Sequence, residues 1–147
     1  MLYNTSGKDA NASIVERVAL DLPFVVDYTA YWYASDNLDE CYYLTMFLNG
    51  AFANEAMKPF QARGLFGPRH VCKNILEVPL ARYKPDNSAH VRLAELGRLC
   101  AEKGKAFVGD HRGAIEGLKL GKLRLDLRAH LKAELDEGDA LLAADLT

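Results

Sequence analysis

Residues 24–35 and 38–49 follow each other closely in the chain but carry different hydrophobic patterns. The first segment, FVVDYTAYWYAS, is rich in β-branched and aromatic residues with partial alternation, which is typical of a strand in a packed sheet. The second, LDECYYLTMFLN, places its apolar residues on one broad helical face, between a capping Asn37 and a terminating Gly50. This switch from a strand pattern to a helix pattern predicts an α+β fold.

The rest of the chain supplies further elements of both kinds. The segment after Gly50 is typical of a second short helix, and residues 89–103 repeat apolar positions at intervals of three and four, which predicts a longer one. Residues 76–82 indicate a short strand in which Pro79 marks an edge or an end. We therefore predict a small sheet, containing the 24–35 and 76–82 strands, covered by helices and followed by a C-terminal helical arm. The polar residues before Ile14 are expected to form a frayed lead-in.

The predicted division is a domain over 14–104, then a hinge and an amphipathic helix over 105–147. Glycines punctuate residues 104–117, which favours a hinge or loop with at most a short helix. In the tail, an apolar stripe is covered on its other sides by charged residues. Its members are Leu123, Leu127, Leu131, Leu135, Gly138, Leu142 and Leu146. The stripe could dock on its own domain or pair with another chain.

Charge and composition narrow the class of protein. The chain has 147 residues and a net charge of −2, so any contact with nucleic acid must be local. Its apolar runs are shorter than a membrane span and its N-terminus does not resemble a signal peptide, so we expect a cytoplasmic protein without a membrane partner. The three cysteines are an odd number and widely spaced, which favours core thiols.

Familiar catalytic patterns are missing from the sequence. It contains no phosphate-binding loop of the Walker type, no GxSxG, no HExxH and no CxxC. Asp110 and His111 form one candidate acid–base pair, although a solvated loop histidine explains them as well. Cys72 has basic neighbours, yet its alternation with Val71 favours a buried thiol. We therefore predict no catalytic residue, no cofactor and no metal site.

One basic, glycine-containing loop stands out within residues 62–80, ARGLFGPRHVCKNILEVPL. Glycines allow backbone amides to approach a ligand closely, and arginines can bind phosphate or guanine edges. The candidate DNA-binding residues are Arg63, Gly64, Gly67, Arg69, His70 and Lys73. Arg69 is the strongest candidate, because a glycine and a proline fix the backbone before it. The alternative is a tight turn with solvated charges.

These same segments resemble a known family. Their order, with the YYL and LN residues of 42–49 and the VPL of 78–80, is similar to the C-terminal target-recognition region of adenine-N6 DNA methyltransferases of restriction-modification systems. It is also similar in layout to the recognition domains of type I specificity subunits. The resemblance covers about Phe24 to Lys103. Gly50 departs from it, since the family usually has serine there.

The resemblance implies a function that involves DNA. The chain lacks the family's glycine-rich S-adenosylmethionine motif and its (N/D)PP(Y/F) catalytic motif. It would therefore be a non-catalytic DNA target-recognition module that binds double-stranded DNA, with a methyltransferase subunit or a second copy of itself as partner. The alternative is a protein-interaction or oligomerisation module that uses the leucine-rich C-terminal helix.

Overall fold

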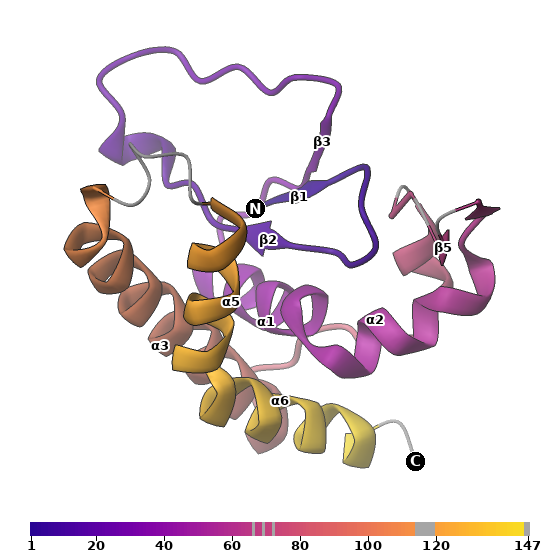
Figure 1. The fold of residues 1–147 in the computed structure, drawn as a ribbon. Helices are drawn as coiled ribbons and strands as arrows, with labels where there is room; N and C mark the ends of the chain where they lie inside the picture. The colour runs from indigo at the N-terminus through magenta and orange to yellow at the C-terminus, as the bar shows by residue number, and fades with distance from the viewer. Residues whose placement is uncertain (66, 69, 72, 114–119, 146–147) are drawn as a thin grey trace.

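The computed structural model describes residues 1–65, 67–68, 70–71, 73–113 and 120–145 of the chain. It is an α+β fold, with a small antiparallel sheet and a β-hairpin beside a set of packed helices (Figure 1). The strands are β1 (Leu2–Asn4), β2 (Ala12–Ser13), β3 (Ala30–Trp32), β4 (Arg63–Gly64) and β5 (Gly67–Pro68). The α-helices are α1 (Leu38–Asn49), α2 (Ala51–Met57), α3 (Ser88–Asp110), α5 (Leu120–His130) and α6 (Lys132–Asp145). Short 3-10 turns are η1 (Arg17–Ala19), η2 (Lys58–Phe60) and η3 (Asn74–Glu77).

Helix α1 lies at the centre of the core and packs against α3, α2 and α6. The Asn37 side chain caps its start by accepting the Glu40 N–H at 3.1 Å. Its buried face includes Tyr43 and Met46, which pack with Leu93 of α3 in one hydrophobic cluster. The predicted helix over 38–49 and the predicted α+β class are confirmed.

The first strand corrects the predicted frayed lead-in. β1 is the middle strand of a three-stranded sheet in the order β2-β1-β3, and Tyr3 is buried in the core. Side chains of the helices hold this segment: Asn49 exchanges two hydrogen bonds with the backbone of Ala12, at 2.8 and 3.0 Å. Buried Asn54 accepts the Ala10 N–H at 2.6 Å. Asparagine pairing with distant backbone is a tertiary effect, which explains why local composition did not predict it.

The predicted strand over 24–35 is reduced to residues 30–32 in the structure. A turn precedes it, in which Asp27 accepts the Thr29 N–H at 2.8 Å and the Ala30 N–H at 3.1 Å. Among the described residues, β1 is the strand that pairs with this segment, and β1 is three residues long. Residues 14–29 instead form a long arc on the side of the sheet away from α6 (Figure 1).

The predicted strand over 76–82 is wrong. The segment begins within η3 and continues as extended chain without a ladder partner. Pro79 has no N–H to offer a sheet, and buried Ile75 and Val78 pack into the helical core instead. The Tyr43 hydroxyl donates a 2.8 Å hydrogen bond to the carbonyl of Ala81, which holds the extended chain beside α1.

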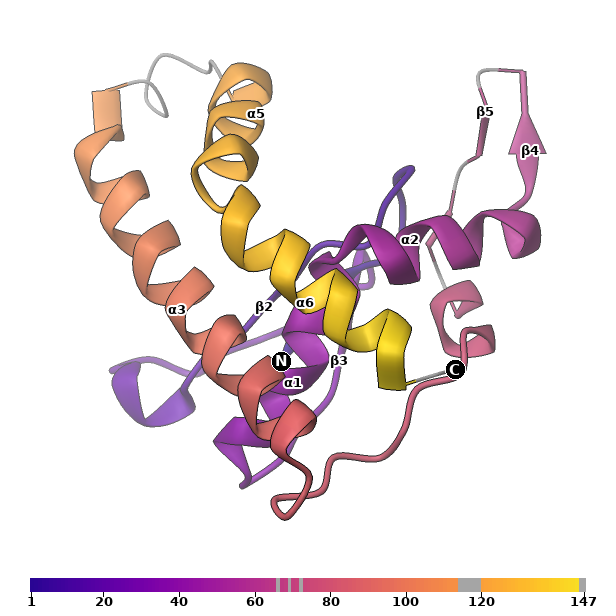
Figure 2. The same cartoon turned by 90° about the horizontal axis from the view of Figure 1, so that it is seen from below.

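Helix α3 is longer than the predicted 89–103 helix. It continues to Asp110, so the first part of the segment expected to be a hinge is helical, and residues 114–119 lie outside the described part of the chain. Helices α5 and α6 follow it in an antiparallel direction (Figure 2). The chain therefore crosses the predicted boundary at residue 104 within a single helix.

Candidate nucleic-acid interface

The basic loop forms a β-hairpin. β4 and β5 pair antiparallel, with Arg63 opposite Pro68 and Gly64 opposite Gly67. Figure 2 shows the two strands extending away from the helices. Leu65 lies at the turn with 94% of its surface exposed. The backbone of this loop therefore projects into solvent as a narrow two-stranded ribbon.

Buried side chains anchor the hairpin at both of its ends. Before β4, the buried Gln61 side chain donates hydrogen bonds to the carbonyl oxygens of Lys8 at 2.9 Å and His70 at 3.4 Å. After β5, Val71 is fully buried and the turn that follows it packs Ile75 into the core. One polar clamp and one apolar anchor thus fix the base of the hairpin on the body of the protein.

His70 has a backbone conformation that L-residues rarely adopt. Its φ angle is 67°, in the left-handed region, which costs a non-glycine residue about 1–2 kcal/mol. Its carbonyl oxygen accepts hydrogen bonds from Gln61 and, at 3.2 Å, from the Asn74 side chain. These two amides hold the strained residue in place, and its own side chain is exposed. Such strain is often stored at functional sites.

The structure describes the predicted DNA-binding residues to different extents. The backbone of Arg63, Gly64 and Gly67 lies in the hairpin, as given by the strand pairing. His70 and Lys73 are exposed at its base. Arg69 lies outside the described residues, as does Cys72. The described members of the set are thus gathered in one hairpin and its base.

One further cation was missed by the sequence analysis. Lys8 is exposed in the β1–β2 loop, and its carbonyl accepts the hydrogen bond from Gln61. Within the described part of the chain, neither Lys8 nor Lys73 forms an ion pair. From Lys58 to Lys84 the sequence holds six lysines and arginines against the single acid Glu77. This segment of the sequence is therefore basic although the whole chain is slightly acidic.

Tyr42 and Tyr43 of α1 pack in the core. The Tyr42 ring lies 5.1 Å from the Arg98 guanidinium carbon. The Tyr43 and His90 rings are tilted by 38° with centroids 4.9 Å apart, and burial raises the pKa of Tyr43 to about 12. Neither tyrosine is available for stacking on a nucleic-acid base.

The leucine stripe of the tail packs on the rest of the chain. Leu123, Gly138 and Leu142 are buried, and α6 contacts α1, α2 and α3. Asp139 of α6 accepts the N–H groups of Ala51 and Phe52 at the start of α2, at 3.0 and 2.9 Å. Over its described length the stripe therefore docks on its own domain, which was the first of the two predicted possibilities. Leu146 lies outside the described residues.

The candidate acid–base pair is not brought together. The His111 ring stacks on Phe107 with centroids 4.1 Å apart, and its Nδ1 lies 2.7 Å from the Phe107 carbonyl oxygen. No hydrogen bond joins it to Asp110 among the described contacts. Within the described segments, no three His, Cys, Asp or Glu side chains gather closely enough to hold a metal ion.

The helices of the described segments are too short or too polar for any of them to cross a lipid bilayer. Comparison of the chain with known protein families, with curated proteins and with solved structures finds no match in any of the three. Function is therefore inferred from the geometry and chemistry of the hairpin, together with the resemblance of its sequence.

Proposed function

We propose that the protein is a non-catalytic DNA target-recognition module of a restriction-modification methyltransferase, and that the β4–β5 hairpin contacts double-stranded DNA. The observation that carries this proposal is the anchored hairpin itself. A two-stranded β-ribbon fits the major groove of B-DNA, which is about 12 Å wide. The clamp by Gln61 and the anchor at Val71 hold the ribbon in a defined position before DNA arrives, so little ordering entropy opposes binding.

The chemistry of the hairpin suits both parts of a DNA contact. Arg63, Arg69 and Lys73 supply cations for phosphates or guanine edges, and Lys8 adds one more from the neighbouring loop. Gly64 and Gly67 pair within the ribbon without side chains that would hold a base edge away. Leu65 at the turn offers an apolar contact for a thymine methyl group.

In vitro selection from a pool of random DNA duplexes tests the recognition function. We expect the wild-type chain to enrich a defined sequence. The combined variant Arg63→Gln, Arg69→Gln and Lys73→Gln should enrich none, because the residues that read bases and fix the register are lost. Failure of the wild type to enrich any sequence would contradict target recognition.

A matched control distinguishes the effect of the hairpin cations from the effect of total charge. Lys105, Lys122 and Arg124 are exposed on α3 and α5, outside the hairpin. Replacing these three by glutamine removes the same charge as the hairpin variant. The control should enrich the same DNA sequence as the wild type. A loss of enrichment in the control alone would place the contact on α3 and α5 and overturn the role of the hairpin.

A further inference from the structure

A second surface, separate from the hairpin, is strongly apolar. The arc between β2 and β3 and the end of β3 expose large side chains that a globular protein usually buries. Their exposed fractions are 95% for Val18, 79% for Leu22, 85% for Val25, 89% for Tyr28 and 66% for Trp32. At about 200 Å² for each aromatic side chain, Tyr28 and Trp32 alone expose roughly 300 Å².

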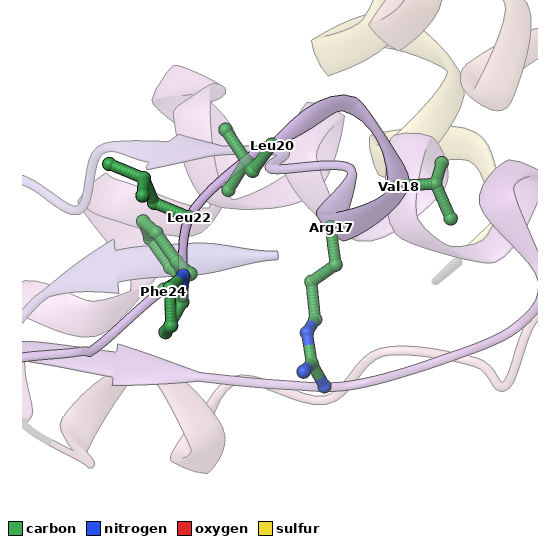
Figure 3. Close-up of a pocket in the computed structure, with 6 residues that line it drawn as sticks. Arg17, Val18, Leu20, Leu22 and Phe24 are labelled. Atoms are coloured by element: carbon green, nitrogen blue, oxygen red, sulfur yellow. The ribbon is translucent and has the colours of Figure 1, made fainter.

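The arc also encloses a hollow. It has a volume of about 410 Å³ and is lined by Arg17, Val18, Leu20, Leu22, Pro23 and Phe24. Figure 3 shows Leu20, Leu22 and Phe24 along one stretch of the arc, with Val18 and Arg17 on the turn of η1. We refer to Val18, Leu22, Val25 and Tyr28, together with this hollow, as the apolar arc.

Strand β3 follows the apolar arc directly in the chain and has one open edge. The Met1 amine and the Tyr33 carbonyl are 2.9 Å apart, and the Tyr33 N–H donates to the Met1 carbonyl at 2.9 Å. Hydrogen-bonded pairs alternate along antiparallel strands. The backbone N–H and C=O of Tyr31 therefore point toward β1, and those of Trp32 point away from it. In the described part of the chain, no strand pairs with β3 on that side. The N–H and C=O of Trp32 are therefore available to a further strand.

The charges around this surface are mostly negative. Between residues 14 and 37 the sequence carries Glu16, Asp21, Asp27 and Asp36 against one cation, Arg17. None of these four acids forms an ion pair with a described residue. A second copy of the chain would bring the same acids to the interface, whereas a partner with lysines or arginines would complement them.

We propose that the open edge of β3 and the apolar arc bind an extended segment of a partner protein, apolar at alternate positions and flanked by lysine or arginine. The segment adds to β3 as a fourth strand, with backbone hydrogen bonds to Trp32 and apolar side chains against Val18, Leu22 and Val25. This surface is distinct from the hairpin, so the inference does not depend on DNA binding. Both contacts can be made at the same time, since the hairpin is held through Gln61 and Val71 rather than on β3.

Two short peptides test the proposal on the full chain. In both, valine and threonine alternate, with paired lysines at the ends of one and paired glutamates at the ends of the other. Trp32 is the only tryptophan in the sequence, so its fluorescence reports the site directly. We expect the lysine peptide to shift the Trp32 emission to shorter wavelength, and at ten times its Kd to slow hydrogen exchange of the Trp32 amide about tenfold. The glutamate peptide should do neither at the same concentration.

Variants on the apolar arc give an independent check. Val18→Ser combined with Val25→Ser should weaken the lysine peptide about tenfold, because two exposed apolar contacts are lost without any change in the core. Leu125→Ser, at a leucine exposed on α5, is the matched control and should bind as the wild type does. The proposal is overturned if neither peptide protects the Trp32 amide. It is also overturned if the chain dimerises and the dimer protects that amide, since a second copy would then be the occupant.

Discussion

The side-chain amide of Gln61 donates a 2.9 Å hydrogen bond to the carbonyl oxygen of Lys8, across 53 positions of sequence. This contact joins the base of the β4–β5 hairpin to the β1–β2 loop. Asn54 of α2 binds Ala10 in the same loop, and Asn49 of α1 binds Ala12 in β2, so side-chain amides connect the hairpin to the core. The proposed DNA contact depends on this rigid base.

Gln61→Ala should destabilise the protein and loosen the hairpin. The Lys8 carbonyl loses the donor from Gln61, and the His70 carbonyl keeps the one from Asn74, so we expect a loss of about 1–3 kcal/mol in the free energy of unfolding. Urea denaturation measures it. Asn74→Ala is the control, because it removes a more exposed bond to the same His70 carbonyl and should cost less than about 1 kcal/mol. Equal costs for the two variants would contradict a special role of Gln61.

Gly97→Ala should separate α1 from α3. A Cβ atom at Gly97 would lie 3.0 Å from the Tyr42 carbonyl carbon and closer still to its oxygen, and this backbone cannot turn aside as a side chain would. We expect a net loss of about 1–3 kcal/mol in the free energy of unfolding, despite the better helix propensity of alanine. Gly121→Ala on α5 meets no atom within 4 Å and should stabilise the chain by up to about 1 kcal/mol. Thermal denaturation of both variants checks the opposite signs.

The link between Lys103 of α3 and Glu134 of α6 predicts a dependence of stability on pH. The hydrogen bond from Lys103 is the main cause that lowers the pKa of the Glu134 carboxyl below 4.5. As the pH falls, Glu134 is therefore protonated at a higher pH in the unfolded chain than in the folded one. The stability that the pair contributes is present above about pH 4.5 and is lost as the pH falls through the pKa of the folded state.

Glu134→Gln tests this dependence. Urea denaturation at about pH 7 and about pH 3 should show a smaller loss of stability on acidification for the variant than for the wild type. Other carboxylates, including Glu137 beside Arg92, still titrate in both proteins, so the comparison isolates the contribution of Glu134. The same loss in both proteins would show that the Lys103–Glu134 pair does not contribute.

The sequence predicted the elements that depend on local pattern. The caps and apolar faces of residues 38–49 and 89–103 are encoded within each segment, and both are helical in the structure. It failed where pairing between distant segments decides the outcome. Residues 24–35 have strand composition, but their available partner, β1, pairs with only three of them. Residues 2–4 have little strand character, yet they form the middle strand because Asn49 and Asn54 hold the chain that follows them.

The candidate site was predicted in part for a similar reason. Glycines and cations within a few positions of each other indicated the loop around Gly64 and Gly67 directly. The clamp by Gln61 and the nearby Lys8 could not be predicted, because they depend on a contact between segments far apart in the sequence. The sequence shows only that a glutamine, Gln61, precedes the basic loop, and this does not indicate its partner.

The salt dependence of DNA affinity tests the central claim most directly. The slope of log K against log salt concentration reports the phosphates neutralised, at about 0.9 for each on B-DNA. We predict that Arg63→Gln, Arg69→Gln and Lys73→Gln together make the slope shallower by about 2–3, whereas the matched substitutions at Lys105, Lys122 and Arg124 leave it unchanged. A hairpin variant with the wild-type slope would contradict the proposal that this hairpin contacts DNA.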